Sequence, residues 1–381
     1  MDFSLSEEQL LVRDMVREFT EQYIQPIAAE LDEKHRFPEE SIGPMAELGF
    51  FGFTLPEEYG GSGDSLCYVV ACEEMAKVSA AHVMIVGSQC TLTTPILIKY
   101  ANRDLRERIV PKMISGDILG CFALSEAGAG CDAAAQQTTA VKQGNSYVIN
   151  GSKMWISNAP QGKMFIVFAM TDASQGVKGI SAFVVEPGAP GTEGFSIGEP
   201  ERKMGMGGSA TTEIVLKDVV VPDSNLLGEE GQGFKIAMET LDGGRVGVAA
   251  MALGIAQGAL EQTIAYTKQR IQFGKPICAN QGVGWMIADM ATRVECARLM
   301  TYRAAALKDS KCPYTKESAM AKLYATETAM YVTEKAVQLH GGLGYTKEFS
   351  VERLMREAKL TEIFEGTNEI QRIVIANQLL R

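Results

Sequence analysis

One carboxylate in the stretch 361–372, Thr-Glu-Ile-Phe-Glu-Gly-Thr-Asn-Glu-Ile-Gln-Arg, has surroundings that suit a catalytic base. Glu365 follows Phe364 and precedes Gly366, and glycine permits a sharp turn or a close approach to a ligand. The threonine and asparagine that follow can cap a new helix. Apolar surroundings raise the pKa of a carboxylate, and nearby amides can bind a carbonyl oxygen, so Glu365 is a candidate general base. By itself, the stretch is explained more simply as a helix-capping turn.

Two further stretches suit a flat polar ligand. Residues 123–132, Ala-Leu-Ser-Glu-Ala-Gly-Ala-Gly-Cys-Asp, are an expected loop whose small residues admit a ring system and whose amides can bind its edges. A tight connection between domains explains this loop equally well. Residues 153–158 place Trp155 at a strand end, where a core position is the default interpretation. The functional alternative is an aromatic cover over a conjugated cofactor, with Ser157 as a hydrogen-bonding partner.

A basic cluster and a glycine turn are the remaining candidates. Residues 268–276 end an expected long helix, and Arg270 there either caps the helix dipole or binds a pyrophosphate. Residues 338–345, Gln-Leu-His-Gly-Gly-Leu-Gly-Tyr, join a helix end to a glycine turn. No strand is expected before them, so they are not a dinucleotide-binding fingerprint. His340 has no carboxylate or serine partner at motif spacing, and we interpret it as structural.

Composition narrows the class of protein. The 381 residues suffice for two or three cooperating domains. A net charge of −11 argues against nucleic acid or an anionic membrane as the main partner, so an anionic ligand needs a local basic pocket. The eight cysteines show no zinc spacing, so we expect reduced, mostly buried thiols and no metal site. Without a signal-like start or an apolar run of membrane-spanning length, we expect a cytoplasmic protein with no membrane insertion.

The expected elements change character twice along the chain. A capping box at Ser6 and Gln9 opens the first helix, and helical patterns continue to residue 120. Strand-like runs then follow one another without helices, which favours an antiparallel sheet or small barrel over a βαβ fold. Long helical patterns return and suit antiparallel packing. The sequence predicts an α+β, mostly α protein with a helical domain over 1–120, a β-domain over 121–226 and a helical bundle over 227–381.

The individual elements follow from spacing and turn residues. Expected helices after the first include 39–48, 65–77, 80–100, 102–115, 234–268, 280–310, 315–340 and 347–360. Expected strands are 138–142, 147–149, 153–157, 165–171, 180–186 and 212–216. The pairs Gly144-Asn145 and Asn150-Gly151 are expected to be turns between the first three strands.

Five stretches, taken in order, resemble the acyl-CoA dehydrogenase family across the whole chain: 123–132, 155–157, 270–274, 338–345 and 364–367. The resemblance implies an N-terminal helical domain, a central antiparallel β-domain and a C-terminal four-helix bundle. It also implies FAD bound between them and a homotetramer. The segment 241–249, Leu-Asp-Gly-Gly-Arg-Val-Gly-Val-Ala, is most similar to the short-chain, butyryl-CoA branch.

The same resemblance assigns cofactor contacts. The flavin would contact Leu124, Ser125, Gly130, Trp155, Ile156 and Ser157 of one subunit, with a further contact at Thr367 and Glu369. The adenine and pyrophosphate part would be reached across a subunit interface by Arg270, Phe273, Gln281, Gln338, Gly341 and Gly342.

For catalysis, Glu365 matches the family base in its Glu-Gly-Thr setting, although Phe364 stands where tyrosine is frequent. Some members carry the base immediately before an arginine on the first bundle helix. Here that arginine corresponds to Arg245, and Gly244 precedes it, so Glu365 has no competitor. The resemblance implies that Glu365 removes the α-proton of an acyl-CoA thioester while the β-hydrogen leaves as hydride to flavin N5, giving the 2-enoyl-CoA. Electrons would pass to electron-transferring flavoprotein, or the site would work as an enoyl-CoA reductase.

Implied substrate contacts are Cys131, Asp242, Arg245, Phe364 and Gly366. Cys131 replaces the usual serine or threonine and is a weaker hydrogen-bond donor. The helix over 79–98, which borders the acyl end in relatives, holds threonines but no arginine or lysine, which argues against dicarboxylic acyl groups. Branched, cyclic and aryl acyl groups stay open. The alternative functions are an oxygen-using flavoenzyme of the same fold and a non-catalytic CoA-binding protein.

Overall fold

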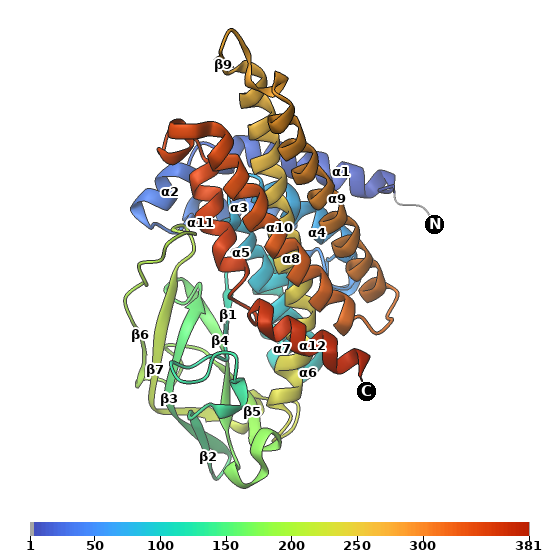
Figure 1. Cartoon of the computed structure of the whole chain (residues 1–381). Coiled ribbons are helices and arrows are strands. Elements are labelled where there is room, and N and C mark those ends of the chain that lie inside the picture. Colours follow the sequence, from blue (N-terminus) through green and yellow to red (C-terminus); the bar gives the residue numbers. More distant parts are fainter. Residues whose placement is uncertain (1–3, 381) are drawn as a thin grey trace.

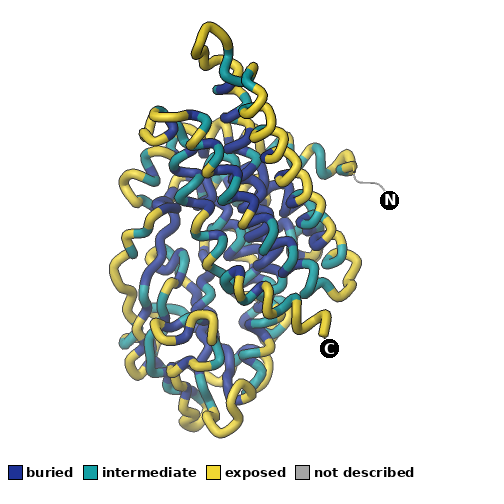
Figure 2. The backbone as a smooth tube through the Cα atoms, viewed as in Figure 1, coloured by how far each residue is buried: buried dark blue, intermediate teal, exposed yellow. Residues whose placement is uncertain are grey.

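The computed structural model describes residues 4–380, in which a helical body carries a β-sheet at one end (Figure 1). The order is helices, then strands, then helices, as expected from the sequence. Buried residues concentrate where the helices pack together and in the interior of the sheet (Figure 2). The domain limits at 120/121 and 226/227 stay a prediction.

The N-terminal helices begin at short polar side chains that cap them. Ser6 and Gln9 form the predicted capping box on the first helix, with each side chain bonded to the other's backbone N–H. Asp64 and Asn102 cap two later helices by accepting backbone N–H groups. The helices are α1 (Glu7–Phe19), α2 (Ala28–Lys34), α3 (Glu39–Glu47), α4 (Ser65–Ala76), α5 (Ala80–Gly87), α6 (Thr94–Tyr100) and α7 (Arg103–Ile114).

The expected single helix over 80–100 is divided. A π-helical segment, Ser88–Thr93, joins α5 to α6 and turns Ser88 and Gln89 into the core, where they bond to the backbone around β1. Within residues 4–380, Ala80–Tyr100 is the one helical run long and apolar enough to cross a membrane. Of its most apolar part, 72% is buried inside the protein, so packing accounts for its apolar composition.

The sheet has eight strands in the order β6-β7-β3-β2-β4-β5-β8, with β1 beside β4. Most pairs are antiparallel, while β1 and β2 meet β4 in parallel. The strands are β1 (Leu119–Ala123), β2 (Thr139–Gln143), β3 (Ser146–Ser157), β4 (Gly162–Met170), β5 (Ile180–Val185), β6 (Phe195–Ile197), β7 (Thr211–Pro222) and β8 (Leu226–Leu227).

The predicted turn at Asn150-Gly151 is wrong, because β3 runs through it. The pairing of β3 with β7 shifts register between Ile149 and Gly151, as at a β-bulge. The Asn150 side chain exchanges two hydrogen bonds with Asp218 of β7. Glycine is needed next to it, since a Cβ on Gly151 would lie 2.7 Å from the Thr138 Cα. The Gly144-Asn145 turn, in contrast, is confirmed.

The C-terminal helices lie close to their predicted bounds. They are α8 (Gly233–Gln269), α9 (Gln281–Asp309), α10 (Thr315–His340), α11 (Val351–Thr361) and α12 (Asn368–Leu379). A short hairpin of β9 (Ile271–Gln272) and β10 (Lys275–Pro276) projects between α8 and α9, far from the sheet (Figure 1). The bundle encloses a core that continues into α1 and α4.

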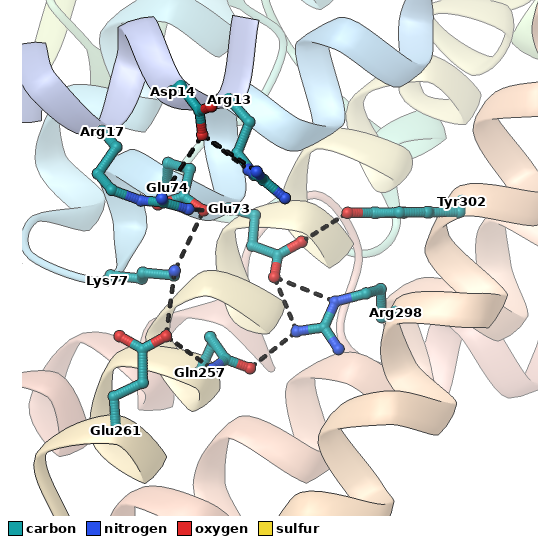
Figure 3. A network of polar contacts seen from close by, with 10 residues as sticks. All are labelled: Arg13, Asp14, Arg17, Glu73, Glu74, Lys77, Gln257, Glu261, Arg298 and Tyr302. Atoms are coloured by element: carbon teal, nitrogen blue, oxygen red, sulfur yellow. Dashed lines mark hydrogen bonds and ion pairs between the residues drawn. The ribbon is translucent and has the colours of Figure 1, made fainter. Parts of the chain in front are cut away.

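A polar network ties α4 to three other helices (Figure 3). The buried Glu73 carboxylate accepts from Arg298 at 2.9 Å and from Tyr302 at 3.0 Å, both on α9. Its neighbour Glu74 pairs with Arg17 of α1 at 3.2 Å and with Lys77 at 3.1 Å. Since breaking a buried pair leaves an uncompensated charge, this network resists displacement of α4.

All eight cysteines lie within the described residues and are free thiols. The expectation that most are buried is only half right. Four are buried, Cys67, Cys72, Cys90 and Cys121, whereas Cys131, Cys296 and Cys312 are exposed and Cys278 is intermediate.

Candidate active site

Glu365 lies in the turn between α11 and α12, in a backbone conformation that residues with side chains rarely adopt. Its φ is +52°, and Gly366 follows at +86°. Thr367 then caps α12 by accepting the Ile370 N–H. The position of Glu365 in a turn before a new helix agrees with the sequence prediction.

Lys322 of α10 braces this turn and was missed by the sequence analysis. Its fully buried ammonium donates to the Gly366 carbonyl and to Asn368 Oδ1, both at 3.0 Å. Burial lowers the pKa of Lys322 to about 8, and the Glu365 carboxylate opposes that shift. The signal was present, because Lys322 falls on the same helical face as Ser318 and Ala325, which are buried.

A cavity of about 570 Å³ opens in front of Glu365. Its walls come from α5, the π-helical segment, α8, the loop after β1, the end of β3 and the turn itself. Eleven of the predicted site residues line it: Leu124, Ser125, Gly130, Cys131, Trp155, Ser157, Arg245, Phe364, Glu365, Gly366 and Thr367. Stretches more than 200 residues apart in sequence therefore meet in one cavity.

The Glu365 carboxylate is an unsatisfied acceptor. Its Oε2 is out of contact with solvent and has no hydrogen-bonding partner among the described residues. Burial raises the pKa of Glu365 to about 7, and the cations Arg245 and Lys322 oppose the rise. The Glu365 backbone N–H also makes no hydrogen bond to any residue that the structure describes. A proton acceptor and a free donor thus lie on one residue.

The Glu365 carboxylate packs against a glycine of α8, Gly244. A Cβ on Gly244 would overlap Oε2 and lie 2.9 Å from Cδ of Glu365. The resemblance implies that Gly244 stands where some members of the family carry the base. Because the Glu365 side chain occupies the space in front of it, one carboxylate is accommodated here.

Comparison with known proteins covers the whole chain. The descriptions "Acyl-CoA dehydrogenase, N-terminal domain", "middle domain" and "C-terminal domain" match residues 6–117, 121–219 and 231–380. A short-chain specific acyl-CoA dehydrogenase of Clostridium acetobutylicum is 49% identical over 382 residues, covering 100% of both chains. The chain belongs to the acyl-CoA dehydrogenase family. The predicted fold class and a flavin-dependent oxidoreductase with FAD as cofactor are thereby confirmed.

The names of other similar proteins refer to different reactions and partners. An acryloyl-CoA reductase (NADH) of Anaerotignum propionicum is 47% identical over 384 residues, covering 100% of this chain and 96% of the relative. The solved butyryl-CoA dehydrogenase of Megasphaera elsdenii has a TM-score of 0.97 at 44% identity, with both chains fully covered. A chain in the solved structure of electron transferring flavoprotein of Acidaminococcus fermentans has a TM-score of 0.97 at 48% identity, again with full coverage.

The loop of this acyl-CoA dehydrogenase that faces the cavity from the β-domain is held by a buried lysine. Lys153 donates to the Leu124 carbonyl at 3.1 Å, to Glu126 at 2.8 Å and to Gln136 at 2.9 Å. Burial lowers the pKa of Lys153 to about 8, and Glu126 opposes that shift. Alternation along β3 signals this position, because Lys153 shares the inward face with Tyr147 and Ile149.

Trp155 is not a core residue. Its side chain is 55% exposed at the cavity wall, and its φ of +64° turns it out of the sheet. The next residue, Ile156, has its side chain in the sheet core, so only its backbone can face the cavity. Cys131 lies beside the turn of Glu365, with its thiol 3.7 Å from the Thr367 hydroxyl.

Asp242, Glu369 and His340, which the sequence analysis also considered, do not line the cavity. Asp242 pairs with Arg245 at 2.6 Å and accepts the Thr315 hydroxyl at 2.6 Å, so it orients the arginine. Glu369 is exposed on the first turn of α12. His340 stacks on Tyr266, with ring centroids 4.2 Å apart, which agrees with its structural interpretation.

The residues assigned to the adenine and pyrophosphate part lie at the hairpin end of the molecule, away from this cavity. They are exposed on the surface at the ends of α8, α9 and α10: Arg270, Phe273, Gln281, Gln338, Gly341 and Gly342. Phe273 is 98% exposed, and Tyr345, which follows Gly342 in the glycine turn, is 88% exposed. Within one chain these residues do not join Glu365.

The residues that line the cavity fit a flavin by their chemistry. The β-domain contributes small residues and backbone amides around Ser125 and Gly130, together with the half-exposed Trp155. The helical bundle contributes the Glu365 Oε2 and the Arg245 Nε, neither of which has a hydrogen-bonding partner among residues 4–380. A cofactor and a thioester placed between these walls would meet the groups that the protein leaves unpaired.

Proposed function

We propose that the chain is an FAD-dependent dehydrogenase that converts a short-chain acyl-CoA thioester into the 2-enoyl-CoA. The observation that carries the proposal concerns Glu365, whose solvent-free Oε2 lies in the cavity. Neither this oxygen nor the backbone N–H of the same residue has a hydrogen-bonding partner within residues 4–380. Short chains are supported by the names of two full-length relatives, the short-chain specific and the butyryl-CoA dehydrogenases.

In this mechanism Glu365 accepts the α-proton of the thioester. The Glu365 N–H donates to the thioester carbonyl and stabilises the enolate-like charge that develops there. Bound FAD would supply the two-electron acceptor for the β-hydrogen. Burial keeps solvent from Glu365 Oε2, and the Lys322 brace fixes the base relative to α10.

We propose that FAD is held by Leu124, Ser125, Gly130, Trp155, the Ile156 backbone, Ser157 and Thr367, with Glu369 at the far side of the same turn. The thioester and CoA arm would contact Cys131, Arg245, Phe364 and Gly366, with Asp242 orienting Arg245. The exposed set at the hairpin end would complete the adenine and pyrophosphate site of a neighbouring subunit in a homotetramer. The exposed aromatic side chains of Phe273 and of Tyr345 support such an interface.

The electron partner we propose is electron-transferring flavoprotein, supported by the matched chain in a structure of that name. A dicarboxylic acyl group is disfavoured, because α5 and the π-helical segment line the cavity with apolar, serine and threonine residues. His82, the histidine of α5, is buried between Ser41 and Ser79 and does not line the cavity. A cytoplasmic location stays a prediction.

The reverse direction is the second candidate function. The 47% identical relative named acryloyl-CoA reductase favours it. A Glu365 pKa of about 7 serves either direction, because near neutral pH the carboxyl group can accept or donate the α-proton.

Anaerobic mixing of purified holoprotein with saturated acyl-CoA thioesters tests the proposal. Butyryl-CoA is expected to bleach the flavin absorbance, and the reduced protein is expected to reoxidise slowly in air. Rapid reoxidation by oxygen would favour the oxidase alternative. A protein that stays colourless after reconstitution with FAD would favour a non-catalytic CoA-binding role.

The rate of flavin reduction is expected to rise with pH, with a midpoint near 7. The unprotonated carboxylate is the base, and burial holds the Glu365 pKa at about 7, so acidification below that value removes the base. Stopped-flow reduction by butyryl-CoA between pH 5.5 and 8.5 measures it. Reduction of crotonyl-CoA should show the opposite slope. A flat profile over this range would contradict the assignment of Glu365 as the base.

A further inference from the structure

At two glycines on one face of α8, a side chain from another element packs against the helix. At Gly244 this side chain is the Glu365 carboxylate. At Gly247 it is the Tyr68 hydroxyl of α4, which would lie 2.5 Å from a Cβ built there. Three residues along a helix correspond to a rise of about 4.5 Å, and both glycines line the cavity. The Tyr68 hydroxyl therefore contacts α8 about one turn beyond the point where the Glu365 carboxylate contacts it.

The Tyr68 side chain lines the cavity between two helices. Its hydroxyl also approaches α5, where a Cβ on Gly87 would lie 3.2 Å away. Tyr68 is 2% exposed, yet it lines the cavity together with Gly87 and Gly247. Because Gly87 and Gly247 have no side chains, there is space between α5 and α8, and the Tyr68 hydroxyl occupies it.

Tyr68 is held firmly in this place. Farther along the same helices, a Cβ on Gly254 would lie 2.7 Å from the Ala76 Cβ, and one on Gly258 would lie 2.8 Å from the Lys77 Cα. Backbone contact this close leaves α4 no room to move toward α8. The ion pairs of Glu73 and Glu74 fix α4 from its other sides (Figure 3).

We propose that Tyr68 determines the upper limit of acyl chain length. The inference rests on the proposed function and adds the residue that sets its short-chain preference. An acyl group whose α-carbon faces Glu365 has about one helical turn of space before it meets the Tyr68 hydroxyl. Each further methylene would then clash with the Tyr68 side chain, which the surrounding packing holds in place. One methylene in a fitted pocket changes kcat/KM by roughly 10- to 200-fold.

The test compares butyryl-, hexanoyl- and octanoyl-CoA in the full-length holoprotein. Tyr68→Phe removes only the hydroxyl, and the ratio of kcat/KM for hexanoyl-CoA over butyryl-CoA is expected to rise about 10-fold. Tyr68→Leu removes more of the ring and should extend the gain to octanoyl-CoA. If Tyr68→Leu yields no flavin-bound protein, the Tyr68→Phe ratio decides by itself.

A second substitution can refill the space. Adding Gly247→Ala to Tyr68→Phe places a methyl group where the hydroxyl was, 3.4 Å from the ring carbons, and should restore the wild-type ratio. Tyr302→Phe is the matched control, because it removes a hydroxyl bound to Glu73 near α4 but outside the cavity. Its ratio should not change.

The outcomes separate the two proposals. If butyryl-CoA fails to reduce the wild-type flavin, the proposed function fails. If the wild type reduces with butyryl-CoA and Tyr68→Phe keeps the wild-type ratio, the role of Tyr68 is overturned and the proposed function stands. A restored ratio in the double variant supports the role of the hydroxyl as the end of the pocket.

Discussion

Glu365→Gln is expected to lower the rate of flavin reduction by butyryl-CoA by about 100- to 10,000-fold while FAD and acyl-CoA still bind. Glutamine keeps the size of the side chain in front of Gly244 but cannot accept the α-proton. The flavin spectrum and the spectral shift on adding a 2-enoyl-CoA measure binding, and stopped-flow absorbance measures reduction. The substitution separates the chemical step from the assembly of the site.

Glu357→Gln is the matched control for Glu365→Gln. Glu357 is also a buried carboxyl group, and burial raises its pKa to about 7 as well. It accepts the Ala80 N–H at 3.1 Å and does not line the cavity, so reduction should proceed near the wild-type rate. Near-normal reduction by Glu365→Gln, or an equal loss in both variants, would contradict the assignment of Glu365.

Gly244→Ala is expected to slow flavin reduction by about 100-fold without lowering thermal stability. The new methyl group would overlap the Glu365 carboxylate, and a displacement of about 1 Å is enough for a loss of that size. Alanine is a better helix former than glycine by about 1 kcal/mol, so the unfolding temperature should be kept or raised. Activity and stability are therefore expected to move apart.

Gly243→Ala, one residue earlier, is the control for this effect. A Cβ on Gly243 meets its nearest neighbours, Lys308 and Tyr314, at an ordinary 3.8 Å. The same gain in helix propensity should appear with normal reduction. If Gly244→Ala reduces as fast as Gly243→Ala, the carboxylate is not held against α8 as described.

Local chemistry let the sequence locate the base. An acid between an aromatic residue and Gly-Thr predicts a turn and a helix cap, and both are determined by neighbouring residues. The bulge at Gly151 was mistaken for a turn because Asn-Gly serves in either role. Only the partner strand β7, through Asp218, decides between them.

Tertiary packing accounts for the residues that the sequence missed. Tyr68 appears in an apolar helix as one more core residue, and its place at the cavity depends on glycines in α5 and α8. Trp155 was expected in the core by default, but its left-handed backbone turns it outward. Lys322 and Lys153 were detectable as charges on buried faces, although the groups they hold come from distant segments.

The left-handed backbone conformation of Glu365 makes the same residue necessary for catalysis and unfavourable for the stability of the folded protein. A side chain in that conformation costs roughly 1–2 kcal/mol, which glycine or asparagine would relieve. Selection for heat tolerance alone would therefore favour losing the acid from position 365. An enzyme of this type evolved for higher temperature should gain its stability elsewhere and retain the strained turn.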